Sequence, residues 1–278
     1  MRWRWAVVFA LTFAVVAVGL VVLAQPWAPD PASRSASDSS DPAGVSDKLR
    51  IDVLARYRHD TGAFTQGLEL HGTDLYEGTG QYGESELRVV DLDTGQVRQR
   101  VRLSDEVFGE GITIAGPRIW QLTWRAGVAY ERDPDTLAEV RQVRYDGEGW
   151  GICHDAAAGR LVMSDGSDQL TFRDPQTFTA TGSVAVTLDG EPLPRLNELE
   201  CVGDEVWANV WQTDRIVRID PASGRVVAEV DAAGLLTGDE RAGADVLNGI
   251  AAVPGTDEFL ITGKYWPALF RVRFVPAV

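Results

Sequence analysis

Five short segments of this 278-residue chain carry a polar or aromatic side chain at nearly constant spacing, and these side chains are the first candidates for chemistry. The steps between them are 44, 40, 48 and 50 residues. If the positions are equivalent in a repeating fold, two amides, two carboxylates and an indole meet in one place. Polar and aromatic groups that converge on one cleft are typical of a ligand site. The five positions are Gln66, Glu110, Trp150, Glu198 and Asn248.

Further aromatic and cationic residues stand near these positions. Trp207–Trp211 alternates on a predicted strand, and the turn-like cluster Gly263–Pro267 contains Lys264, the only lysine expected in the folded part. Simpler interpretations stay open, because tryptophans can pack between repeats and an inward-facing glutamate can accept backbone hydrogen bonds for structural reasons. The residues expected around the pocket, besides these, are Phe64, Gln66, Phe108, Glu110, Trp150, Asn197, Glu198 and Asn248.

A second recurring signal predicts the elements that position these residues. A tight turn, in which Asp accepts backbone hydrogen bonds and Gly or a substitute closes the turn, recurs at steps of 42, 41 and 46 residues. Each turn joins two alternating segments, which indicates a β-hairpin. Residues 64–103 contain four such short strands, and four antiparallel strands per repeat of roughly 40–50 residues are typical of a propeller blade. The turns begin at Asp91, Asp133, Asp174 and Asp220.

The predicted fold class is therefore all-β: a five-bladed β-propeller of four-stranded antiparallel blades, preceded by an N-terminal signal or anchor segment. The strand expected at Ile51–Tyr57 precedes the first inner strand and should complete the last blade, so that the two ends of the chain pair and close the ring. Glycines beside the inward positions are expected to permit close approach of strands at a crowded axis. They are Gly67, Gly111, Gly151 and Gly249.

Three regions differ in composition. Residues 1–24 begin with basic side chains and continue as an apolar run, as in a secretory signal peptide or a membrane anchor through residues 5–24. Residues 25–48 are rich in Pro, Ser, Ala and Asp and indicate a disordered linker, and residues 49–278 form the propeller domain. The protein is therefore predicted to be exported, that is, secreted, periplasmic or anchored to the outer face of the cytoplasmic membrane.

The charge of the chain limits its partners. All of the net charge of −15 falls on the folded part, because the first 48 residues contain equal numbers of acidic and basic side chains. Such a surface repels nucleic acid and anionic lipid headgroups and favours solubility and cationic partners. A closed propeller leaves no strand edge unpaired, which favours a monomer.

The chain has few residues suited to metal binding or crosslinking. Three histidines occur without a CxxC or HExxH arrangement, so no protein zinc site is expected. Cys153 and Cys201 each follow an inward position by three residues. A disulfide between adjacent blades stays open, but equivalent inner-strand positions usually lie too far apart, and two buried thiols are favoured.

Taken in order, these segments resemble the plant and bacterial type of glutaminyl-peptide cyclotransferase (glutamine cyclotransferase). The resemblance runs from about residue 52 to residue 273; each motif alone is weak, but the ordered set is specific. It implies a five-bladed propeller with a metal-free active site and no cofactor. The motifs are Phe64–Gly67, Tyr76–Gly80, Phe108–Gly111, Gly149–Gly151, Leu196–Leu199, Trp207–Trp211 and Leu247–Ile250.

The resemblance implies conversion of the N-terminal glutaminyl residue of a peptide or protein to pyroglutamyl, with release of ammonia. Glu110 matches the glutamate of the family's FGEG motif and is the implied general acid/base, which takes a proton from the α-amine and passes it to the leaving nitrogen. As a fixed cation, Lys264 is expected either to hold Glu110 in position or to polarise the substrate carbonyl. The sequence does not separate these two roles. The implied substrate-binding residues are Phe64, Gln66, Phe108, Trp150, Asn197, Trp211 and Lys264.

Two other classes remain as alternatives. A non-catalytic exported propeller that binds peptides or proteins would keep the glycines and turns without needing Glu110 and Lys264 together. A lactonase-like propeller would hold a calcium ion among axial carboxylates and amides. Trp150 and Gln66 at inward positions suit an organic ligand better than a hard cation. The residues that suggest a calcium site are Glu110, Asn197, Glu198 and Asn248.

Overall fold

The computed structural model describes residues 45–277, and within this range the chain forms mainly antiparallel β-sheets and one short helix. Three sheets have four strands each. The first contains β2 (Thr65–His71), β3 (Asp74–Thr79), β4 (Glu86–Asp91) and β5 (Val97–Arg102). The second contains β6 (Gly109–Ala115), β7 (Arg118–Thr123), β8 (Val128–Arg132) and β9 (Glu139–Arg144). The third contains β10 (Ile152–Asp155), β11 (Arg160–Ser164), β12 (Gln169–Arg173) and β13 (Ala180–Ala185).

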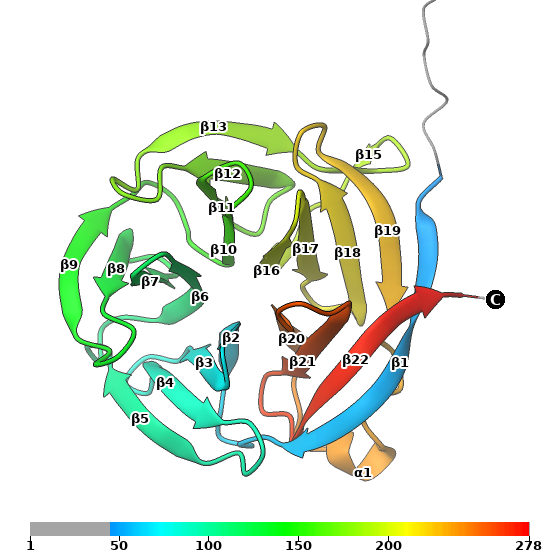
Figure 1. The fold of residues 1–278 in the computed structure, drawn as a ribbon, viewed down its shortest axis with the longest axis horizontal. Coiled ribbons are helices and arrows are strands. Elements are labelled where there is room, and N and C mark those ends of the chain that lie inside the picture. Colours follow the sequence, from blue (N-terminus) through cyan, green and yellow to red (C-terminus); the bar gives the residue numbers. More distant parts are fainter. Residues whose placement is uncertain (1–44, 278) are drawn as a thin grey trace, which may run out of the picture. The chain divides into compact units, whose positions relative to one another are not determined.

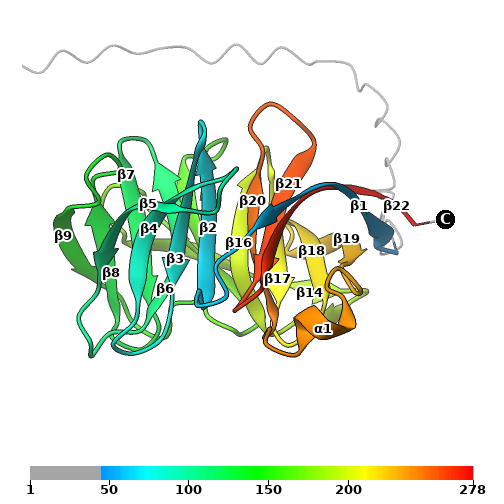
Figure 2. The same cartoon turned by 90° about the horizontal axis from the view of Figure 1, so that it is seen from below.

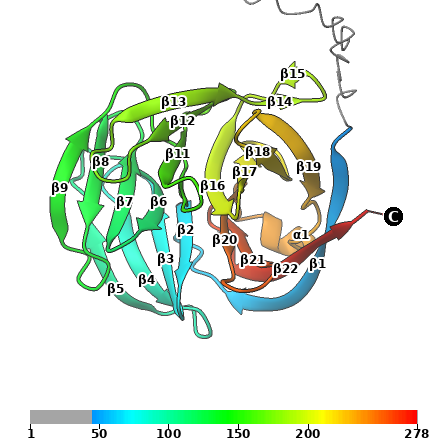
Figure 3. The ribbon, with the colours of Figure 1, turned by 45° about the horizontal axis from the view of Figure 1, so that its top comes forward.

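The remaining strands form one ten-stranded sheet. Its main path runs through β16 (Leu196–Val202), β17 (Glu205–Val210), β18 (Arg215–Asp220), β19 (Arg225–Asp231), β1 (Asp47–Arg58), β22 (Ala268–Pro276), β21 (Glu258–Gly263) and β20 (Leu247–Ala252). A small hairpin, β14 (Thr187–Leu188) and β15 (Glu191–Pro192), joins this sheet at β19 (Figure 3). The helix α1 (Gly238–Arg241) lies in the connection between β19 and β20.

The sheets surround a common centre, with β2, β6, β10, β16 and β20 innermost (Figure 1). The predicted all-β fold of four-stranded antiparallel sheets is thus confirmed. Four strands on either side of the β19–β1 contact correspond to the fourth and fifth predicted blades. Because these two groups are hydrogen-bonded into one sheet, the number of five blades stays a prediction.

Strand β1 closes the ring as predicted. It pairs antiparallel with β22 from Leu49↔Pro276 to Arg58↔Ala268, so the first and last described strands lie side by side (Figure 2). Its first residues, Asp47–Arg50, also pair in parallel with β19. The strand therefore begins two residues before the predicted domain start, and Lys48 joins Lys264 as a second lysine of the fold.

The predicted hairpin turns form as their residues dictate. The Asp91 carboxylate accepts hydrogen bonds from the Thr94 backbone N–H at 2.9 Å and from its hydroxyl at 2.8 Å. The closing positions adopt the left-handed backbone, with φ of 69° at Gly95 and 74° at Gly224. Leu137 and Phe178 take the same conformation at 57° and 63°. Their side chains are buried in the core between sheets, which offsets the cost of a positive φ at a non-glycine residue.

The inner strands approach one another so closely that glycine is required at the centre. A Cβ on Gly151 would meet the carbonyl oxygen of Asn197 at 2.0 Å, and one on Gly111 would meet that of Trp150 at 2.7 Å. The predicted reason is confirmed for Gly67, Gly111 and Gly151; Gly249 instead has a φ of 120°, and the nearest neighbours of a Cβ there are side-chain atoms at 3.1 Å or more.

The register of β16 corrects one sequence equivalence. Leu196 pairs with the last residue of β17, as Gly109 pairs with the last residue of β7. The residue that follows Leu196, Asn197, is therefore the equivalent of Glu110. Glu198 occupies the position of the axial glycines instead.

Glu198 links two other inner strands from this position. Its carboxylate accepts the backbone N–H groups of Leu68 at 3.1 Å and Ile250 at 2.8 Å, so it satisfies donors on β2 and β20 that face the axis. Burial and the neighbouring Glu200 carboxyl raise the pKa of Glu198 well above its usual value.

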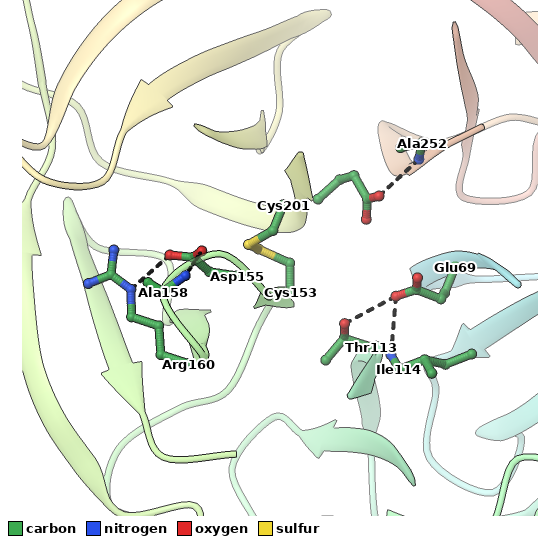
Figure 4. Close-up of a disulfide and its surroundings, with 10 residues drawn as sticks. Glu69, Thr113, Ile114, Cys153, Asp155, Ala158, Arg160, Cys201 and Ala252 are labelled. Atoms are coloured by element: carbon green, nitrogen blue, oxygen red, sulfur yellow. Dashed lines mark hydrogen bonds and ion pairs between the residues drawn. A yellow bond between two sulfur atoms is a disulfide. The ribbon is translucent and has the colours of Figure 1, made fainter. Parts of the chain in front are cut away.

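The expectation of two free thiols is wrong, because Cys153 and Cys201 form a disulfide between β10 and β16 (Figure 4). The corrected register explains why: Cys153 is equivalent to Glu200, so the two cysteines are one residue out of step and their Cα atoms lie 5.4 Å apart. This distance falls within the range that a disulfide spans. Between two other inner strands, β2 and β6, the Glu69 carboxylate accepts hydrogen bonds from Thr113 and Ile114 (Figure 4).

The predicted signal or anchor segment, residues 1–24, and most of the predicted linker lie outside the described residues. Within residues 45–277, no helix has the length and apolar character needed to cross a bilayer.

Candidate active site

All eight residues that the family resemblance implied for the site line one cavity of about 360 Å³, whereas Glu198 and Asn248, also expected around the pocket, are not among its lining residues. The cavity lies at the end of the central channel where the inner strands begin and the second strands of the sheets end. Five further residues complete its wall. The predicted lining residues are Phe64, Gln66, Phe108, Glu110, Trp150, Asn197, Trp211 and Lys264, and the additional ones are Gln81, Trp124, Gln212, Asp245 and Val246.

A shift of strand register positions the inner residues. The pairing of β2, β6, β16 and β20 with their neighbours slips at the start of each strand, where Gln66, Glu110, Asn197 and Asn248 stand. Such a bulge leaves one residue outside the regular ladder and redirects its side chain. The recurring inward segments thus place these polar residues around one mouth of the channel.

The ends of the second strands supply the remaining groups. Trp124, Trp211 and Lys264 each directly follow the last residue of β7, β17 and β21. The residue after Trp211, Gln212, has a φ of 61°, and the residue after Lys264, Tyr265, has a φ of 60°. Backbone held in this sparsely populated region often lies at functional sites.

Glu110 is a buried carboxyl without a partner in the protein. Only 4% of the residue is exposed, and within residues 45–277 no hydrogen bond or ion pair reaches its oxygens. Burial raises the pKa of Glu110 well above its usual value; the positive charge of Lys264 opposes this shift and the charge of Glu148 adds to it. A carboxyl with a raised pKa and free oxygens can both accept and donate a proton near neutral pH.

Lys264 brings a cation into the same cavity. Its Nζ lies 4.6 Å from the centre of the Phe64 ring, and the side chain is buried. The pKa of Lys264 is lowered by burial, and the charges of Glu110 and Asp245 offset only part of this shift. Because Lys264 forms no ion pair with Glu110, its ammonium group is free to face a bound ligand.

Aromatic side chains form the walls. Phe108 contacts Phe64 and Trp124 edge to face, with ring centres 6.0 and 5.6 Å apart. Trp150 and Trp211 meet in the same way at 5.4 Å. These rings enclose a space suited to the methylene groups of a short side chain.

Glu148 holds two of these walls in place. One oxygen accepts hydrogen bonds from the indole N–H groups of Trp124 at 2.7 Å and Trp150 at 3.0 Å, and the other accepts from Arg125 at 2.8 Å. Burial would raise the pKa of Glu148, but these hydrogen bonds outweigh it and lower the pKa. Glu148 is therefore anionic and holds the two indole rings in place through hydrogen bonds.

The amides of Gln66 and Asn197 complete the polar part of the cavity, and Asn248, which does not line it, binds Gln66. The Asn248 side-chain amide donates to the Thr65 carbonyl at 3.0 Å and to Gln66 Oε1 at 3.3 Å, which leaves the Gln66 NH₂ group for a ligand. Asn197 Oδ1 is buried and accepts no hydrogen bond from the described residues. An unpaired buried acceptor is costly, so a ligand donor at this position would remove the penalty.

Sequence reasoning missed Trp124, Gln81, Gln212, Asp245 and Val246. The signal for Trp124 was present, because it stands directly after the second strand of its blade, as do Trp211 and Lys264 in theirs. Gln212 likewise follows Trp211. Asp245 and Val246 come from an irregular segment between α1 and β20, where no periodicity predicts which side chains face the cavity.

No group of three or more His, Cys, Asp or Glu that could hold a metal ion occurs within residues 45–277. Glu198, one of the four residues that suggested a calcium site, accepts the two backbone N–H groups described above.

Comparison with known proteins gives one consistent result. A model of the glutamine cyclotransferase family matches residues 27–274. A protein of Arabidopsis thaliana named glutaminyl-peptide cyclotransferase is 40% identical over 233 residues, which cover 82% of this chain and 72% of the plant protein. The crystal structure of the Myxococcus xanthus glutaminyl cyclase is similar with a TM-score of 0.76 and 39% identity, covering 84% of this chain and 100% of the bacterial one.

Proposed function

The chain belongs to the glutamine cyclotransferase family, and from this premise we propose that it converts N-terminal glutaminyl residues of peptides to pyroglutamyl with release of ammonia. The observation that carries the proposal is the buried, unpartnered carboxyl of Glu110 inside a cavity walled by aromatic rings. The resemblance seen in the sequence led to the same reaction.

The reaction needs a neutral amine, a stabilised oxyanion and a protonated leaving group. The α-amine nitrogen attacks the carbon of its own side-chain carboxamide, a C–N bond forms, and the C–NH₂ bond breaks to give ammonia. An α-amine has a pKa near about 8, so a carboxylate of raised pKa is a competent base for its proton. Glu110 takes this proton and delivers it to the departing NH₂ group.

The other groups bind and polarise the substrate. The Lys264 ammonium and the free NH₂ of Gln66 face the oxygen that becomes negative in the tetrahedral intermediate. Asn197 Oδ1 accepts a hydrogen bond from the substrate amine or amide. Trp150 and Trp211 confine the glutaminyl side chain in the bent shape that brings its two ends together and exclude water, which suppresses hydrolysis.

We further propose that the enzyme needs no metal ion, because proton transfer and charge stabilisation are assigned to Glu110, Gln66 and Lys264. Ammonia release from a glutaminyl dipeptide should be equal before and after dialysis against EDTA. A loss of activity that added metal restores would contradict metal independence. Absence of ammonia release in both samples would instead reject the proposed function.

Export is proposed on the apolar N-terminal segment and is supported by the Cys153–Cys201 disulfide, since disulfides persist mainly in oxidising compartments. Mass spectrometry of the mature N-terminus would distinguish a cleaved signal peptide from a retained anchor. If cell fractionation found all of the protein in the cytoplasm with its N-terminal segment uncleaved, export would be refuted.

A further inference from the structure

We propose that a groove beside the cavity binds the second residue of the peptide substrate and that Asp245 favours a cationic side chain there. This inference rests on the proposed function and adds a specificity site to it.

The groove continues directly from the cavity. It has a volume of about 310 Å³ and lies between the β17–β18 turn and the segment that leads into β20. Gln212, Asp245 and Val246 line both spaces. A peptide whose first residue fills the cavity must extend outward from it, and this shared wall offers a continuous path for the next residue.

Asp245 is held firmly at the shared wall. Its backbone N–H donates to the Lys264 carbonyl at 2.8 Å, and its own carbonyl accepts from the Trp266 indole N–H at 2.9 Å. The next residue, Val246, accepts from the Lys264 N–H at 2.9 Å. The backbone of Asp245 is therefore held next to the lysine proposed to act on the substrate.

The charges of the groove favour a cation at this position. Asp214 already forms an ion pair with Arg241 at 3.2 Å. Asp245 is exposed, and within residues 45–277 no basic side chain forms an ion pair with it; the only hydrogen bond that its carboxylate accepts there is from the neighbouring Val246 N–H. A positively charged second residue of the substrate would meet this free carboxylate, whereas an acidic one would be repelled.

The test compares peptides within each enzyme variant, so that effects on the chemistry itself cancel. Ammonia release is measured for Gln-Arg, Gln-Ala and Gln-Glu peptides, and kcat/KM for the arginine peptide is divided by that for the alanine peptide. An exposed ion pair changes this ratio by about two- to fivefold. The ratio should exceed one in the wild type and fall toward one in Asp245→Asn.

The matched control is Glu106→Gln, which removes the same charge from an exposed side chain in the loop before β6 and outside the groove. Its ratio should equal that of the wild type. A wild-type ratio near one, a ratio unchanged in Asp245→Asn, or an equal fall in both variants would overturn the inference. Release from the alanine peptide by the wild type shows separately that the proposed function stands; release from no peptide would overturn both.

Discussion

Replacement of Glu110 by glutamine is expected to lower kcat/KM for a glutaminyl peptide by about 10²- to 10⁴-fold, the usual contribution of a positioned general acid/base. The substitution keeps the shape of the side chain but cannot carry the proton from the α-amine to the leaving nitrogen. Since Glu110 has no hydrogen-bond partner among the described residues, its replacement should leave the fold intact. The measurement is the initial rate of ammonia release by both proteins.

Glu69→Gln is the matched control for this variant. Glu69 is also a carboxyl on an inner strand, and burial raises its pKa to about 7, but it does not line the cavity. Its replacement can cost stability, because Glu69 accepts hydrogen bonds from Thr113 and Ile114. A comparable loss of rate in both variants at a temperature where both are folded would show that Glu110 has no special role.

Replacement of Lys264 by methionine is expected to reduce kcat/KM by about 10²- to 10³-fold, as removal of one oxyanion-stabilising donor does in other enzymes. Methionine keeps an unbranched apolar side chain next to Phe64 but carries no charge. Loss of the cation should also raise the pKa of Glu110 further, because the positive charge of Lys264 lowers it. The acid limb of the pH profile, where Glu110 becomes protonated and stops acting as a base, should therefore move to higher pH.

The pH profile separates the two roles that the sequence left open for Lys264. A fall in kcat/KM at every pH, with a modest shift of the acid limb, fits direct polarisation of the substrate carbonyl. A shift of the acid limb with full activity restored at higher pH would mean that Lys264 acts only on Glu110. The absence of an ion pair between the two side chains favours the first result.

Much of the architecture follows from local chemistry that the sequence displays. The Asp turns and the axial glycines depend on few neighbouring residues, so their spacing predicted strands and ring closure correctly. Gln66, Glu110 and Trp150, which stand at recurring inward positions, line one cavity for the same reason, whereas Trp211 and Lys264 were implied by the family resemblance.

Features that depend on register or on irregular backbone were not predictable in this way. Asn197 and Glu198 are both polar, so the sequence alone does not show which of them stands at the inward position. That one-residue ambiguity also hid the Cys153–Cys201 disulfide, because equivalent positions seemed too distant to pair. Asp245 reaches the cavity through backbone hydrogen bonds with the Lys264 turn, which no periodic pattern encodes.

The central claim is that the cavity holds one glutaminyl residue so that its own α-amine displaces its side-chain nitrogen. The most direct test is mass spectrometry of a single incubation of the wild-type protein with a glutaminyl peptide and its N-acetylated form. Only the peptide with the free amine should lose ammonia, and its product should be pyroglutamyl. Conversion of the acetylated peptide to a glutamyl product would mean that water is the nucleophile and would contradict the mechanism.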